Sequence, residues 1–145
     1  MGRPPIQQVA ITIESQFVLE GGRRDKHEYR YAGELHLMNG TWYIKYVEQD
    51  EAGETKATVK VRPDEVVVIR NGLVSMRQSF RLGVTTSGVF ESLAGPMQMD
   101  TETTDVRVKY DEEGYLCEAV WNYTLFLNEQ EAGHYMVTCS LQRKR

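Results

Sequence analysis

Apolar and polar residues alternate with a period of two through most of the chain between Val9 and Leu141. Segments 9–14 and 29–37 are two examples of this alternation. No window of 11 or more residues has a convincing 3.6-residue period. Alternation of this kind is typical of strands with one buried and one exposed face. The chain is therefore predicted to be an all-β domain whose strands surround a single interior.

Turn signals divide this pattern into segments. Asn39-Gly40 and Asn71-Gly72 are each typical of a two-residue type I′ hairpin turn, whereas 128–133 reads as a longer acidic loop. Strands are predicted near 6–19, 26–38, 41–49, 54–62, 65–70, 73–81, 84–91, 97–110, 114–127 and 133–142. Short connections favour an antiparallel meander, which forms a sandwich or closes on itself. Closure removes exposed edges, so we predict a single closed antiparallel up-and-down β-barrel of 8–10 strands.

Length and composition limit the functional classes. The 145 residues suffice for one domain with its own core, and residues 1–5 are expected to form a flexible tail. A net charge of −4 without a basic stripe argues against a nucleic-acid partner. Without an apolar stretch long enough to cross a bilayer, no membrane partner is expected. Two cysteines and no recognisable signal peptide favour a cytoplasmic protein.

The alternation also predicts which side chains face the interior. Polar residues on that inner phase either satisfy one another or form the polar floor of a cavity. If a cavity exists, we expect it to exceed about 300 Å³ beside Gln78 and Thr101. Ten inner-phase residues are the candidate ligand-binding set: Tyr31, Trp42, Tyr46, Gln78, Phe80, Met99, Thr101, Thr103, Trp121 and Tyr123.

No catalytic motif, metal site or cofactor site is found in the sequence. His36 and His134 fall on the outer phase, and His27 is the inner-phase histidine that an enzyme using the lumen would need. Cys139 is expected opposite about residue 122, too far from Cys117 for a disulfide, so both thiols are expected to be free and buried. The protein is therefore predicted not to be an enzyme and to carry no cofactor or metal.

Glycines within predicted strands have two interpretations. Gly33 and Gly88 mark either barrel corners or bulges, or places where a ligand approaches the backbone.

Several segments together resemble the YwiB-like family of uncharacterised bacterial β-barrel proteins. The resemblance covers most of the chain, and it is carried by segments 31–35, 41–44, 76–83, 86–90, 100–103 and 123–128, with Met76-Arg77-Gln78 the most specific. It implies a calycin-type, lipocalin-like barrel and adds no function, since none is established for the family. The chain departs from the expected pattern at Ala94 and at Glu129-Gln130, both in loops.

Two functions from different classes fit these observations best. The first is binding of a small apolar or amphipathic ligand inside the barrel. The alternative is a protein–protein interaction module with a filled barrel, which would use outward apolar residues such as Tyr43, Val47, Val67 and Ile69. The oligomeric state is not predicted.

Overall fold

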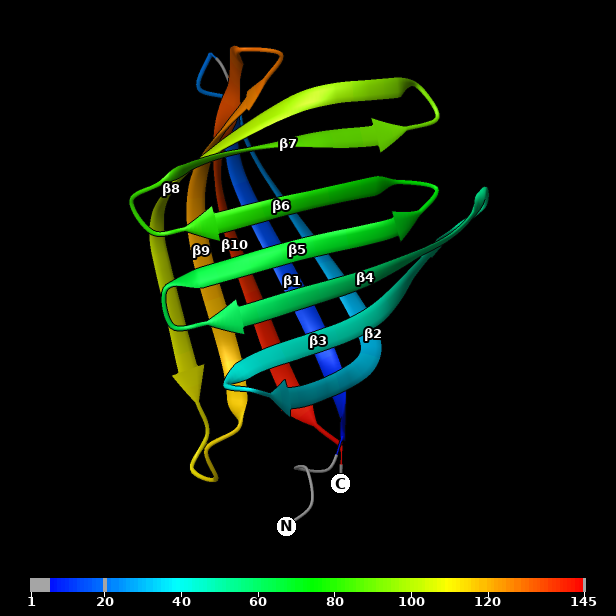
Figure 1. The fold of residues 1–145 in the computed structure, drawn as a ribbon, viewed down its shortest axis with the longest axis vertical. Coiled ribbons are helices and arrows are strands. Elements are labelled where there is room, and N and C mark those ends of the chain that lie inside the picture. Colours follow the sequence, from blue (N-terminus) through cyan, green and yellow to red (C-terminus); the bar gives the residue numbers. More distant parts are fainter. Residues whose placement is uncertain (1–5, 20, 145) are drawn as a thin grey trace.

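The computed structural model describes residues 6–19 and 21–144, and these form an antiparallel barrel. Its strands are β1 (Gln7–Leu19), β2 (Arg24–Met38), β3 (Thr41–Asp50), β4 (Gly53–Arg62), β5 (Glu65–Gly72), β6 (Ser75–Arg81), β7 (Thr85–Ser92), β8 (Gly95–Tyr110), β9 (Leu116–Leu127) and β10 (Gln130–Arg143). Each strand pairs with its sequence neighbours, and β1 pairs with β10 (Figure 1). The prediction of a closed up-and-down barrel is confirmed. The expected tail, residues 1–5, lies outside the described residues.

The barrel has two sides whose strands run in different directions. Strands β3 to β7 cross the front of Figure 1, whereas β1, β9 and β10 run steeply behind them. Strand β2 joins the two sides, because residues 24–35 pair with β1 and residues 34–38 pair with β3. Gly33 lies at this change of partner, where a Cβ atom would lie 2.4 Å from the Lys45 carbonyl oxygen and 2.6 Å from Ile11 Cδ1. The corner interpretation of Gly33 therefore fits, since only glycine leaves room for the bend.

One of the two predicted Asn-Gly turns is confirmed and the other is wrong. Asn39 and Gly40 have φ angles of 51° and 77°, as a type I′ turn requires. Asn71 and Gly72 instead continue β5 and pair with Lys56 and Thr55 of β4. The β4 backbone lies so close to Gly72 that a Cβ atom would be 2.3 Å from the Glu54 carbonyl oxygen. The glycine thus serves close strand packing, and the chain turns after it.

The predicted long loop at 128–133 is also wrong. Asn128 and Glu129 have φ angles of 48° and 70°, and Leu127 pairs with Gln130, so the turn has two residues. Asn128 is fixed by reciprocal hydrogen bonds with the Gln98 backbone, which donates to Asn128 Oδ1 at 3.1 Å and accepts from Asn128 N at 3.0 Å. These contacts hold a non-glycine residue in the left-handed region.

The tighter turn shifts the register of the last hairpin. Cys139 lies opposite Ala119 rather than opposite residue 122. Both thiols are free, as predicted, but only Cys139 is buried, and Cys117 is half-buried. Burial raises the pKa of the Cys139 thiol to about 12, which keeps it protonated and unreactive at neutral pH.

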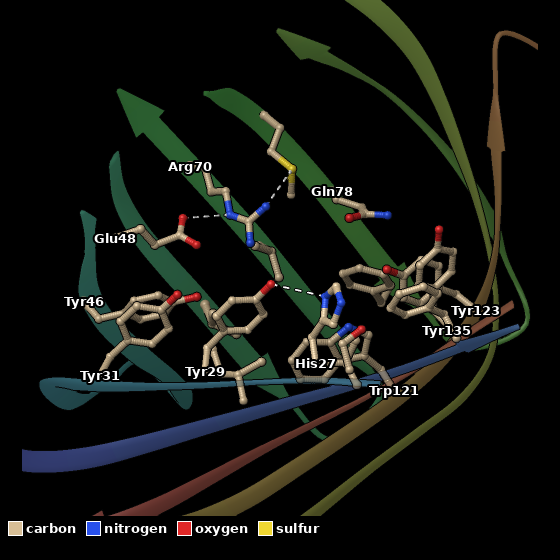
Figure 2. Close-up of a pocket in the computed structure, with 18 residues that line it drawn as sticks. His27, Tyr29, Tyr31, Tyr46, Glu48, Arg70, Gln78, Trp121, Tyr123 and Tyr135 are labelled. Atoms are coloured by element: carbon tan, nitrogen blue, oxygen red, sulfur yellow. Dashed lines mark hydrogen bonds and ion pairs between the residues drawn. The ribbon is translucent and has the colours of Figure 1, made fainter. Parts of the chain in front are cut away.

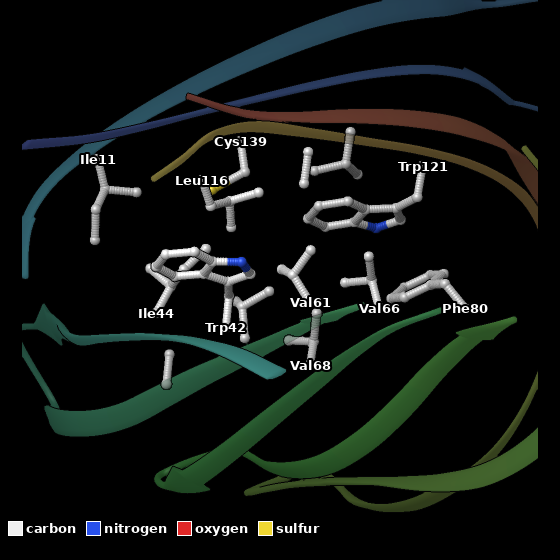
Figure 3. Packing of buried hydrophobic residues seen from close by; sticks show 14 of the residues in the cluster. Ile11, Trp42, Ile44, Val61, Val66, Val68, Phe80, Leu116, Trp121 and Cys139 are labelled. Atoms are coloured by element: carbon white, nitrogen blue, oxygen red, sulfur yellow. The ribbon is translucent and has the colours of Figure 1, made fainter. Parts of the chain in front are cut away.

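The interior is densely packed at the end that carries the β2–β3 and β8–β9 turns. Ile44 and Val61 are fully buried there, and Figure 3 shows Trp42 among them. The Trp42 and Tyr115 rings are in contact, with their centroids 6.0 Å apart. The Arg143 guanidinium lies over the same Tyr115 ring, 4.1 Å from its centre. We call this part of the barrel the closed end.

Candidate functional site

A cavity of about 410 Å³ occupies the opposite part of the lumen. Its lining residues lie near the β1–β2, β3–β4 and β5–β6 turns, and we call this part the open end. Tyr29 lines the cavity and is 48% exposed, so the cavity communicates with solvent. The volume falls in the range of small-molecule sites. Figure 2 shows the side chains that line it.

One wall of the cavity is a continuous row of aromatic rings in contact. The pairing register places Phe17 of β1 opposite Tyr135 of β10, and Tyr135 opposite Tyr123 of β9. Their rings stack, with centroids 5.5 Å apart for the first pair and 5.1 Å for the second. Phe80 of β6 extends the row, because its centroid is 4.7 Å from Tyr123 and 5.6 Å from Trp121. Rings in such contact attract one another and present a broad apolar surface.

The row continues at the mouth of the cavity. The His27 ring meets Phe17 edge-on at 5.3 Å and contacts Tyr29 at 6.1 Å. His27 Nδ1 also lies 3.3 Å from the Tyr29 hydroxyl. Nε2 is 3.8 Å from Asp25 Oδ2, which connects the rim to an exposed carboxylate.

The opposite wall carries an ion pair. Arg70 Nε of β5 lies 3.0 Å from Glu48 Oε1 of β3, and both side chains are about a quarter to a third exposed. The two strands are separated by β4, where Ala57 lies opposite both Tyr46 and Arg70. The small alanine side chain leaves the space across which Arg70 reaches Glu48. Beside this pair, the rings of Tyr31 and Tyr46 stack with centroids 4.5 Å apart.

A buried hydrogen bond closes the cavity toward β8. Gln78 Nε2 of β6 donates to Thr101 Oγ1 of β8 at 2.9 Å, and both residues are buried. Strand β7 lies between β6 and β8 in the sheet, and it pairs with β6 through two residue pairs in the described structure. The contact therefore joins strands that are not neighbours in the sheet, and it leaves Gln78 Oε1 as a polar atom on the cavity wall.

The hydroxyls of Tyr31, Tyr46, Tyr123 and Tyr135 stay neutral at neutral pH. Burial raises the pKa of Tyr46 and of Tyr123 well above the usual value for tyrosine. Burial also raises the pKa of Tyr31, with a further contribution from the Glu48 carboxylate, and it raises the pKa of Tyr135. Each hydroxyl can thus both donate and accept a hydrogen bond at neutral pH.

Six of the ten residues in the predicted binding set line this cavity. They are Tyr31, Tyr46, Gln78, Phe80, Trp121 and Tyr123. The cavity also exceeds the expected volume of about 300 Å³. Whether these residues bind a ligand stays a prediction.

The other four lie away from the cavity. Trp42 belongs to the closed end, where it packs against Tyr115. Thr101 is separated from the cavity by Gln78, to which it is hydrogen-bonded, and Thr103 pairs with Tyr123, whose side chain lines the cavity. Met99 is buried on the same strand. Alternation correctly placed all four inside the barrel, but it cannot show how far along the lumen the open space extends.

Glu48 and Arg70 are the cavity residues that the sequence interpretation missed. Both continue an inner phase that was recognised, since Glu48 follows Tyr46 by two residues and Arg70 follows Val68 by two. The signal was therefore present in the alternation. A charged residue near a strand end is usually solvated, and for that reason it was not assigned to the lumen.

The four outward residues named for the alternative function differ in their exposure. Val67 is buried, Tyr43 and Ile69 are half-buried, and Val47 is 43% exposed. Lys60 covers part of Tyr43, with its Nζ 5.6 Å from the ring centre. An interaction surface on this face stays a prediction, with one of its four residues well exposed.

Within residues 6–19 and 21–144, no group of three or more histidine, cysteine, aspartate or glutamate side chains could hold a metal ion. In the same part of the chain there is no helix of the length and apolar character needed to cross a membrane.

Fold and cavity define a ten-stranded antiparallel β-barrel with one filled end and one open end. The backbone is similar to that in the crystal structure of the YwiB protein from Bacillus subtilis, with a TM-score of 0.76 over 95% of this chain and 94% of that chain, at 22% sequence identity. Residues 11–139 match the family model described as "Domain of unknown function (DUF1934)". The "Uncharacterized beta-barrel protein YwiB" of Bacillus subtilis (strain 168) is 32% identical over 108 residues, which are 74% of this chain and 76% of that protein. The chain belongs to this family, as the sequence resemblance indicated.

Proposed function

We propose that this protein binds a small amphipathic molecule in the cavity at the open end of the barrel. The observation that carries the proposal is the cavity of about 410 Å³, with stacked rings on one wall and the Glu48–Arg70 pair on the other. Ligand sites commonly combine an apolar lining with a few polar groups that fix orientation. The proposal is for binding without a chemical step.

The first test is native mass spectrometry of protein purified from its host without denaturation. A reproducible additional mass of a few hundred daltons that is lost on denaturation would support a bound small molecule. A dimer or larger mass without this addition would favour the interaction-module alternative.

A second test uses the neutral fluorescent probe N-phenyl-1-naphthylamine. We expect saturable binding of one probe per chain. Ser15 lines the cavity, so Ser15→Phe should fill part of it and weaken binding about tenfold, equivalent to about 1.4 kcal/mol. Ser87→Phe is the matched control, because Ser87 is exposed on the outer face of β7.

A bare monomer mass together with no saturable probe binding would contradict the proposal. Equal weakening by Ser15→Phe and Ser87→Phe would also contradict it, since the probe would then be bound elsewhere.

A further inference from the structure

Arg70 has more hydrogen-bond donors than its protein partners use. A guanidinium carries five N–H groups. In the described part of the chain, its one oxygen partner is Glu48, 3.0 Å from Nε. The contact is an ion pair without the direction of a good hydrogen bond, since the buried Nε has no hydrogen-bond partner. Nη1 lies 3.8 Å from the Met76 sulfur, and a thioether is a weak acceptor.

Among the described residues, both terminal nitrogens of the guanidinium lack a strong acceptor. Glu48 approaches Nε, so the edge made by Nη1 and Nη2 keeps no strong acceptor. That edge has the spacing of a carboxylate, which binds arginine through two parallel hydrogen bonds. Glu48 also restrains the side chain before any ligand arrives, which reduces the entropy lost on binding.

The surroundings of Arg70 indicate what the rest of such a ligand would be. Figure 2 draws Arg70 and Gln78 on one side of the cavity and the ring-bearing side chains, among them His27 and Tyr135, on the other. The rings of Tyr123 and Tyr135 lie nearly parallel, at an interplanar angle of 10°. A flat apolar body can lie against such a wall, because aromatic rings in contact attract one another beyond the burial of apolar area.

A cationic ligand fits the same cavity less well. Its natural partner would be Glu48, whose carboxylate is already paired with Arg70. The same carboxylate also raises the pKa of the Tyr31 hydroxyl, after burial. A second cation there would compete with the guanidinium. A carboxylate instead takes donors that nothing else in the cavity uses.

We propose that the ligand is a carboxylate with a flat apolar body, held by the Nη1/Nη2 edge of Arg70 and lying against the row of rings. This inference rests on the proposed function and adds the chemical class of the ligand. Arg70 is the residue that determines specificity, and Glu48 positions it.

The test measures a series that shares one body and differs in charge. 2-Naphthoate, 2-naphthamide and 2-naphthylmethylammonium are titrated by calorimetry into wild-type protein, Arg70→Met and Arg77→Met. Arg77 is the matched control, because it is exposed on the outer face of β6. Wild type and Arg77→Met should bind the carboxylate about tenfold more tightly than the amide, and Arg70→Met should lose this preference.

Binding of N-phenyl-1-naphthylamine separates loss of the cavity from loss of the charge contact. The neutral probe should bind Arg70→Met within about twofold of wild type, and thermal unfolding monitored by circular dichroism should show a folded protein. A wild-type preference for the amide or the ammonium, or an unchanged carboxylate preference in Arg70→Met, would overturn the inference. If the probe binds wild type and the series shows no preference, only the ligand class is wrong. If neither probe nor series binds, the proposed function itself fails.

Discussion

The two tryptophans lie in differently filled parts of the same barrel. Trp42, at the closed end, contacts Tyr110 and Tyr115 at interplanar angles of 46° and 54°. Trp121 lines the cavity and packs against Phe80, next to rings that stack along the wall. Both side chains are buried, at 9% and 4% exposure, and both lie on the inner phase of their strands. Alternation therefore does not distinguish a filled end from a hollow one.

The two ends differ in the stacked rings and the charges that face the lumen at the open end. Ring tilt alone does not separate them, because Phe80 is tilted by 41° against Trp121 and by 56° against Tyr123 at the open end. At the open end, Tyr123 and Tyr135 lie on directly paired positions, so their rings stack on each other along the wall. The charged pair opposite them favours contact with water. The cavity lies between the stacked rings and this charged pair.

The largest expected effect comes from truncating one isoleucine at each end. Ile44→Ala removes a fully buried side chain at the closed end and should lower the free energy of unfolding by about 3 kcal/mol, through lost burial and a new cavity. Ile13→Ala enlarges an existing solvent-connected cavity and should cost less than about 1.5 kcal/mol. Urea unfolding of both variants measures the difference. Equal losses would mean that the open end is packed as tightly as the closed end.

The next effect is a decrease of stability at alkaline pH. Tyr46 and Tyr123 have folded-state pKa values above the unfolded value of about 10 because they are buried. Their contribution is fully present below about pH 10 and is lost as pH rises, because the unfolded chain releases protons that the folded chain retains. The slope should reach about 1.4 kcal/mol per pH unit for each tyrosine.

Urea unfolding between pH 8 and pH 11 tests this prediction, with Tyr46→Phe and Tyr123→Phe as variants. Each variant should flatten the profile relative to wild type. Parallel profiles in all three proteins would show that these hydroxyls ionise as easily in the folded state as in the unfolded chain.

The smallest expected effect is in tryptophan fluorescence. Trp42→Phe leaves Trp121 as the reporter of the open end, and Trp121→Phe leaves Trp42 as the reporter of the closed end. Both indoles are buried, Trp42 at 9% and Trp121 at 4% exposure, but Trp121 alone of the two borders the solvent-connected cavity. Acrylamide that enters this cavity should therefore quench the first variant more strongly. Stern–Volmer slopes provide the measurement. A larger slope for Trp121→Phe would reverse the assignment of the open and closed ends.

Much of the fold could be predicted because its signals are local. Each strand carries its own alternation, and Asn39-Gly40 carries the φ preferences of its turn. The turns at 71–72 and 128–133 could not be predicted in the same way. Gly72 is required by the approach of Glu54, and Asn128 is held by Gln98, so both depend on strands distant in sequence.

The candidate site also has a part that local sequence signals predict and a part that they do not. Alternation alone places Tyr46, Gln78 and Tyr123 in the lumen, because the side-chain period of a strand is fixed. The contact of Arg70 with Glu48 across Ala57 depends instead on how the strands pair, and so does the row formed by Phe17, Tyr135 and Tyr123. Alternation assigns each side chain to a face, whereas the register between strands determines which side chains meet and how much space they leave.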